Sequence, residues 1–155
     1  MRATLCVIAV VTAALVGAEV GAGADGTGAA VPLFVDAWAS SGSGDENLEN
    51  PRGVAVHPLT GDVYVADTAN DRIVQYDADG RFLRVFGTTP IAGLPLDAPW
   101  DVAASPIGVY VADAGNHRIV RYTSFGQATA VWGSQGGGNL RFRSPKGIAI
   151  GPTNT

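Results

Sequence analysis

The chain contains one segment pattern twice, at a spacing of 46 residues. Val-Tyr-Val-Ala-Asp at residues 63–67 returns at residues 109–113, and each copy is followed by an asparagine and then by Arg-Ile-Val. The positions that recur at this spacing are Tyr64, Asp67, Asn70, Arg72, Tyr76, Gly80 and Gly87, which return as Tyr110, Asp113, Asn116, Arg118, Tyr122, Gly126 and Gly133. A fixed period of this size is typical of propellers and solenoids, which repeat one supersecondary unit. The repeat therefore constrains the fold more than any single residue does.

Each repeat unit predicts a four-stranded antiparallel meander. In the first unit, apolar and β-branched residues gather in four short segments separated by Gly, Asp and Asn: residues 51–56, 63–66, 72–76 and 81–86. The second unit repeats the pattern from Pro99 to Trp132. Alternating segments bounded by such turn residues are the signature of strands joined by tight turns. With 15% charged residues and 21 glycines, the composition also favours an all-β fold.

The connections between units are also regular. An aromatic residue precedes each inter-unit proline by 13 residues, and an apolar residue stands three positions before it: Trp38 and Leu48, Phe86 and Leu96, Trp132 and Phe142. We expect these pairs to hold each connection against the sheets, because a connection of this length without anchors is uncommon in a compact domain.

The two units resemble NHL repeats, the blades of NHL-type β-propellers. Residues 51–87 contain Pro-Arg-Gly-Val-Ala-Val, then Val-Tyr-Val-Ala-Asp-Thr, then Asn-Asp-Arg-Ile and a closing Phe-Gly. Residues 98–133 repeat this series with two departures, since Asp101 replaces the first glycine and Ala114 replaces the threonine. The resemblance implies an all-β protein made of β-propeller blades.

The resemblance extends over residues 34–155 and implies an incomplete propeller. Residues 34–38 resemble the last strand of a preceding blade, and residues 144–150 resemble the first strand of a following one. Propellers close with about 4–8 blades, whereas this sequence holds two complete units, at 51–87 and 98–133. We therefore expect the chain to be the N-terminal fragment of a longer protein. The alternative is that several copies associate through open blade edges into a ring.

The first 24 residues predict a secretory signal peptide. Arg2 supplies a positive charge, residues 4–16 form an apolar run, and Ala-Gly-Ala at residues 22–24 resembles a cleavage site. An uncleaved anchor is the alternative. Residues 25–33, rich in Gly and Ala, predict a flexible lead-in. We expect a protein secreted to the extracellular space or the periplasm, with no membrane attachment after the leader is cleaved.

Charge and ligand content disfavour nucleic-acid and metal binding. The net charge is −4 and no basic tract is present, so we expect no nucleic-acid partner. The one cysteine, Cys6, lies in the leader, and the two histidines, His57 and His117, occupy different repeat positions in a turn and a loop. We expect both histidines at the surface, and no metal or cofactor. The acidic run at residues 45–50 lacks the alternating spacing of a calcium loop and is interpreted as a solvated linker.

Two acid–arginine pairs, Asp67 with Arg72 and Asp113 with Arg118, could be catalytic or structural. Each pair spans a short loop between the second and third strands, where a carboxylate and a guanidinium can form a bidentate bond that fixes the turn. Because both units carry the pair, we interpret these four residues as structural loop clasps.

The positions that differ between units are the candidates for binding. In a propeller the first strand lines the channel, and the residues after each inter-unit proline differ in chemistry: Arg52, Trp100 and Lys146. Asp101 and the loop residue His117 should share this channel-mouth face. An aromatic ring with mixed charge is suited to recognition, although Trp100 could instead fill the blade junction.

These observations predict a secreted, non-catalytic propeller that binds a protein or a small ligand at the channel-mouth face. The residues include no nucleophile–base pair, metal-ligand cluster or phosphate loop. The alternative is a fragment of a propeller lyase, similar to amidating or streptogramin lyases, with its catalytic residues in other blades. RNA binding, known among related proteins, is disfavoured by the leader and the acidic balance.

Overall fold

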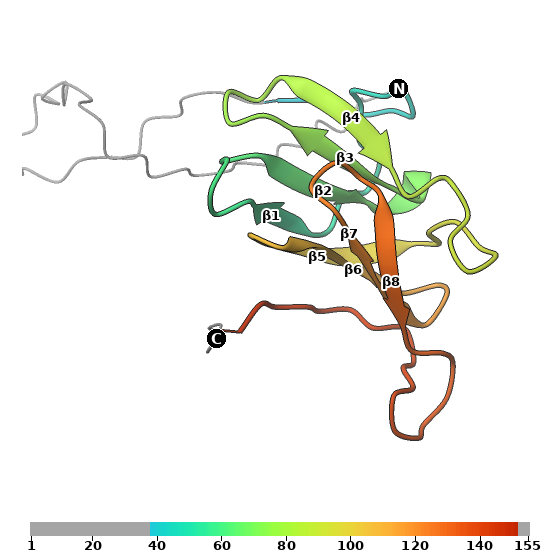
Figure 1. Cartoon of the computed structure of the whole chain (residues 1–155). Coiled ribbons are helices and arrows are strands. Elements are labelled where there is room, and N and C mark those ends of the chain that lie inside the picture. The colour runs from blue at the N-terminus through green and yellow to red at the C-terminus, as the bar shows by residue number, and fades with distance from the viewer. Residues whose placement is uncertain (1–37, 152–155) are drawn as a thin grey trace, which may run out of the picture.

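The computed structural model describes residues 38–151, which consist almost entirely of β-strands. The strands form two four-stranded antiparallel sheets, each with its strands in chain order, as Figure 1 shows. The first sheet contains β1 (Val54–Val56), β2 (Val63–Asp67), β3 (Arg72–Tyr76) and β4 (Phe82–Phe86). The second contains β5 (Pro99–Ser105), β6 (Gly108–Asp113), β7 (Arg118–Tyr122) and β8 (Ala128–Trp132). The predicted all-β fold of two antiparallel meanders is confirmed, and we call the sheets the first and second blade.

Several sequence-based expectations fall outside the described residues. These are the leader at 1–24, the lead-in at 25–33 and all but the last residue of the strand at 34–38. The structure assigns no strand to residues 144–150, where we expected the first strand of a following blade. In both blades the first strand is hydrogen-bonded to the second strand of the same blade. The described residues contain no second strand that could pair with residues 144–150. Within residues 38–151, no helix has the length and apolar character needed to cross a membrane.

The first strand of the first blade is shorter than expected, although its pairing starts earlier. β1 begins at Val54 rather than at residue 51. Before it, the Arg52 amide donates to the Ala66 carbonyl at 3.1 Å, and the Ala66 amide donates to the Gly53 carbonyl at 2.8 Å. These two bonds tie residues 52 and 53 to β2, so their positions at the end of the sheet are fixed.

The central strands are buried on both faces. All five residues of β2 are buried, and so are all five of β3. Tyr64 and Ala66 of β2 belong to a core between the blades, together with Phe86, Val102 and Tyr122 among others. The alternate β2 residues contribute to a second core on the other side of the sheet. β5 lies against β1 and β2, so the two blades pack face to face, as in a propeller.

The apolar residues of the first two long connections are buried as expected, whereas Trp132 of the third is exposed. Leu48 and Leu96 are almost fully buried. A side chain at Gly87, whose φ of 96° is in the left-handed region, would overlap Leu96. The glycine that follows β4 is therefore needed both for its backbone angle and for the space that the leucine occupies.

Three of the four tyrosines should ionise only at high pH. Burial removes the phenols of Tyr64, Tyr76 and Tyr122 from water and raises the pKa of each to about 12. Since the folded protein holds these protons more tightly than the unfolded chain does, the phenols stabilise the fold below about pH 10. This contribution is lost as the pH rises from 10 to 12. Absorbance at 295 nm should show these three tyrosines ionising together with unfolding. Ionisation of these three near pH 10 in a still folded protein would contradict the assignment.

Candidate functional site

The first candidate residues, Asp67 and Arg72, form a buried ion pair where β2 passes into β3. Arg72 Nε donates to Asp67 Oδ2 at 2.8 Å, and the Asp67 side chain is fully buried. The expected bidentate bond is absent from this pair. Arg72 Nη2 instead donates to the carbonyls of Gly44 and Asn47, at 2.6 and 3.0 Å. Asp67 Oδ1 accepts the Glu49 amide at 2.6 Å. The pair thus fastens the connection that enters the blade, in addition to its own loop.

The second pair repeats this arrangement. Arg118 Nε lies 2.5 Å from Asp113 Oδ2, and both side chains are buried. The remaining guanidinium nitrogens donate to the carbonyls of Ile91 and Leu94, at 2.9 and 2.8 Å. Asp113 Oδ1 accepts the Asp97 amide at 2.8 Å. Because every oxygen of the carboxylates is engaged, the geometry is that of a structural clasp.

Trp100 owes its position to a bulge at the start of β5. Pro99 pairs with Asp113 and Asp101 pairs with Ala112, so Trp100 is an extra residue without a partner on β6. A bulge of this kind redirects a side chain and is common next to binding sites. The sequence showed the variable residue after the proline, and the structure shows the backbone irregularity that presents it.

The Trp100 ring lies between two cations from neighbouring repeats. Arg52 Cζ is 3.8 Å from the centroid of the ring, and Lys146 Nζ is 4.3 Å from it. Both cations are therefore in direct contact with the indole. We call these three residues the Trp100 stack. Cation–π contacts of this kind contribute about 0.5–2 kcal/mol each. The structure brings together three of the five predicted channel-mouth residues, and the Trp100 ring contacts two cations of the chain itself.

Asp101 joins three consecutive repeats. Its Oδ1 accepts the Val102 amide at 2.9 Å, and its Oδ2 accepts the Ile148 amide at 3.0 Å. On the other side, a Cβ at Gly53 would lie 2.5 Å from the Asp101 Cα atom. The backbones of the first and second blades therefore touch at this point. Both carboxylate oxygens of Asp101 hold the backbone, which explains an aspartate where the first repeat has glycine.

His117 supports the following segment at the position that Asp71 occupies in the first blade. Asp71 Oδ1 accepts the Ala98 amide at 2.7 Å, and His117 Nδ1 accepts the Ser144 amide at 2.9 Å. Ala98 and Ser144 each precede a proline and each have a φ of 44°. The His117 ring is thus used to hold the backbone between repeats. Sequence reasoning selected His117 but not Asp71, although the two residues occupy equivalent positions in the two repeats.

The other histidine, His57, is buried. Its side chain is only 5% exposed, and Nδ1 accepts the amides of Leu59 and Thr60, both at 3.3 Å. The surface position expected for His57 is therefore wrong, because the ring closes the turn between β1 and β2 from the inside. Within residues 38–151, no three His, Cys, Asp or Glu side chains are grouped as ligands for a metal ion.

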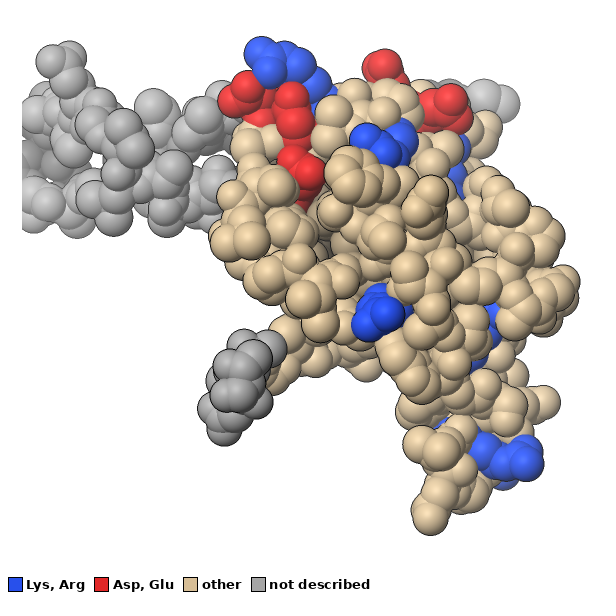
Figure 2. All heavy atoms as spheres, in the orientation of Figure 1, with Lys and Arg blue, Asp and Glu red and all other residues tan. Residues whose placement is uncertain are grey.

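Charge is divided between the two ends of the described chain. No Asp or Glu follows Asp113, whereas five cations do: Arg118, Arg121, Arg141, Arg143 and Lys146. In Figure 2 the visible acidic side chains lie on the upper part of the molecule, where Figure 1 places the first blade, and those visible on the lower part are basic. The Trp100 stack adds Arg52 to this basic side, since Arg52 and Lys146 contact the same ring.

Comparison with protein families matches residues 48–76 to the NHL repeat. The matched segment covers β1 to β3 together with the Asp67–Arg72 clasp. The second blade has the same strand order, and its β6–β7 register and clasp correspond to those of β2–β3. A search among curated proteins gives no match to the chain. The first sheet therefore contains an NHL repeat, the unit of which β-propeller blades are built, and the second sheet repeats its architecture.

Proposed function

We propose that this protein is a secreted, non-catalytic binding scaffold whose Trp100 stack binds an acidic segment of a protein partner. The observation that carries the proposal is the pairing of two cations on one tryptophan without a neutralising acid. None of the ion pairs among residues 38–151 involves Arg52 or Lys146. Both side chains are exposed. Their charges are therefore available to carboxylates of a partner.

The arrangement favours specificity as well as attraction. The Trp100 ring fixes both cations, so less side-chain entropy is lost when they bind an anion. Trp and Arg are also enriched among residues that dominate binding energy at interfaces. The absence of acidic residues after Asp113 extends the positive potential around Lys146.

Two further parts of the proposal rest on separate evidence. Secretion rests on the leader predicted for residues 1–24. The non-catalytic role rests on the clasps, because Asp67 and Asp113 are buried and use their carboxylate oxygens to hold backbone amides and arginines. We place the alternative, a propeller lyase, second because these acids are committed to structural contacts.

Binding can be measured with a fluorescein-labelled hexaglutamate peptide and fluorescence anisotropy. We expect Arg52→Ala and Lys146→Ala each to weaken binding by about threefold to tenfold, because each removes one exposed ion pair between the protein and a peptide carboxylate. Binding should also weaken as salt is raised from about 50 to 300 mM. Arg81→Ala is the matched control, since Arg81 is an exposed arginine already paired with Asp77 and Asp79.

The same experiment distinguishes other partners. Equal losses of peptide affinity for Arg81→Ala and Lys146→Ala would show that binding depends only on the net charge of the protein, and would overturn the proposed site. Tighter binding of a decauridine RNA than of the peptide at the same salt concentration would replace the protein partner with RNA.

A further inference from the structure

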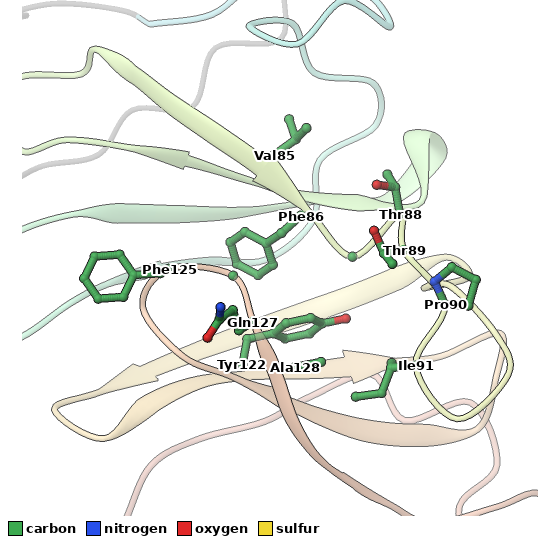
Figure 3. Close-up of a pocket in the computed structure, with 12 residues that line it drawn as sticks. Val85, Phe86, Thr88, Thr89, Pro90, Ile91, Tyr122, Phe125, Gln127 and Ala128 are labelled. Atoms are coloured by element: carbon green, nitrogen blue, oxygen red, sulfur yellow. The ribbon is translucent and has the colours of Figure 1, made fainter.

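A groove lies between the two blades, and none of the Trp100 stack residues lines it. It has a volume of about 430 Å³ and is lined by the end of β4, the connection after it and the turn between β7 and β8. The lining residues that matter here are Phe86, Thr89, Ile91, Tyr122, Gln127 and Ala128. Figure 3 shows the Phe86 and Tyr122 rings close together within this group, with the Tyr122 hydroxyl directed toward the side where Pro90 and Ile91 lie. We call this space the interblade groove.

The groove exists because the two repeats differ at one position. In the first blade, Tyr76 pairs across the strands with Phe82, and the two rings meet edge to face with centroids 6.4 Å apart. In the second blade the corresponding pair is Tyr122 with Ala128. Directly paired residues project from the same face of a sheet. The space that a phenyl ring fills beside Tyr76 is therefore left open beside Tyr122.

The hydroxyls of Tyr76 and Tyr122 also differ in their hydrogen bonding. The Tyr76 hydroxyl donates to the Glu46 carbonyl at 3.3 Å. The Tyr122 side chain is 2% exposed, and its hydroxyl has no hydrogen-bond partner within residues 38–151. A buried polar group without a partner costs about 1–3 kcal/mol. Since burial raises the pKa of Tyr122 to about 12, the group stays protonated at neutral pH and can donate.

The lining of the groove selects a neutral molecule. Among residues 38–151, no Asp, Glu, Lys or Arg lines it. The Phe86 and Tyr122 ring centroids are 5.0 Å apart, which gives the groove an aromatic wall. Thr88, Thr89 and Gln127 add uncharged polar groups to this wall. A volume of this size is within the range of small-molecule sites.

We propose that the interblade groove binds a small, neutral aromatic molecule that carries a carbonyl acceptor. The aromatic ring takes the place beside Tyr122 that the Phe82 ring takes beside Tyr76. The carbonyl accepts the hydrogen bond of the Tyr122 hydroxyl. This site is separate from the Trp100 stack and shares no residue with it.

The probe for this proposal is 4-fluorobenzamide, whose binding to the full chain is followed by ¹⁹F NMR. We expect saturable binding with an affinity of about 1 mM, as is usual for a ligand of this size. Amide shift changes in ¹H–¹⁵N spectra should be confined to residues 85–91 and 122–128. Tyr122→Phe should weaken 4-fluorobenzamide about threefold to tenfold, and should leave fluorobenzene, which has no carbonyl, unchanged.

Ala128→Phe restores the ring present in the first blade and should abolish binding of both compounds. Ile107→Phe, which adds a ring at a position that is 71% exposed and outside the groove, is the matched control. If Ala128→Phe binds 4-fluorobenzamide as the unaltered chain does, the proposal fails. If Ala128→Phe does not fold, the spectra of the unaltered chain decide, because shift changes outside the two segments overturn the site.

Discussion

Arg118→Ala should lower the free energy of unfolding by about 3–5 kcal/mol, the usual effect of removing one partner from a buried ion pair. The substitution leaves the fully buried Asp113 carboxylate without its guanidinium. It also removes the guanidinium donor from the carbonyls of Ile91 and Leu94, which keep only the bonds from each other's amides. The connection between the blades then loses the part of its attachment that Arg118 provides, while the bond from the Asp97 amide to Asp113 remains. A loss of this size is a large part of the stability of an ordinary domain, about 5–15 kcal/mol. Urea unfolding followed by circular dichroism measures it.

Two comparisons separate the clasp from a general effect of charge. Arg81→Ala removes an exposed arginine that is paired with exposed or half-exposed aspartates, and should change the unfolding free energy by no more than about 0.5 kcal/mol. The double variant Asp113→Ala with Arg118→Ala should cost less than the sum of the two single variants, because the two residues interact directly. Equal midpoints for Arg118→Ala and Arg81→Ala would contradict the structural role of the clasp.

The blades could be predicted because their information is local and repeated. Strand residues 63–67 and 72–76 alternate between two cores, and the same residue types return 46 positions later. A repeat position that keeps its residue in both units, such as Asp67 and Asp113, can be assigned to the blade itself. The clasps were predicted from this recurrence, whereas the bonds from each arginine to the preceding connection were not, and the structure has a single Nε–Oδ2 bond in place of the expected bidentate one.

The contacts between blades could not be predicted in the same way. The bulge at Trp100, and with it the contact to both Arg52 and Lys146, depends on how neighbouring repeats pack. The left-handed backbone at Ala98, with a φ of 44°, could not be predicted either, because a residue that precedes proline usually adopts an extended conformation. Its cause is the hydrogen bond from its amide to Asp71, 27 positions earlier.

Differences between the repeats are where the two proposed sites lie. Gly53 becomes Asp101, and Phe82 becomes Ala128, at otherwise equivalent positions. The first change ties the second blade to the segment after it, through the Ile148 amide. The second change opens the interblade groove. The repeated positions thus build the blades, and the positions that differ between repeats determine what can bind at the junctions between them.

Gly53→Ala should lower the free energy of unfolding by about 1–3 kcal/mol, the range for overfilling a packed interior. A Cβ at this position would lie 2.5 Å from the Asp101 Cα atom and 2.9 Å from the Val102 backbone nitrogen. Backbone atoms cannot move aside by a change of rotamer, so the first blade must shift away from β5. Because Arg52 is the preceding residue, its contact with Trp100 should loosen as well. Tryptophan emission should therefore change in the folded state, before any unfolding.

Gly147 provides the matched control for this prediction. It stands two residues after Pro145, as Gly53 stands two residues after Pro51, but a Cβ there would meet nothing within 4 Å. Gly147→Ala should therefore change the unfolding free energy by no more than about 0.5 kcal/mol and leave the tryptophan emission as it is. The two substitutions remove the same backbone freedom, so any difference between them measures the contact between blades. Equal stability of the two variants would show that the first and second blades do not touch at Gly53, and would also remove the support that this contact gives to the Trp100 stack.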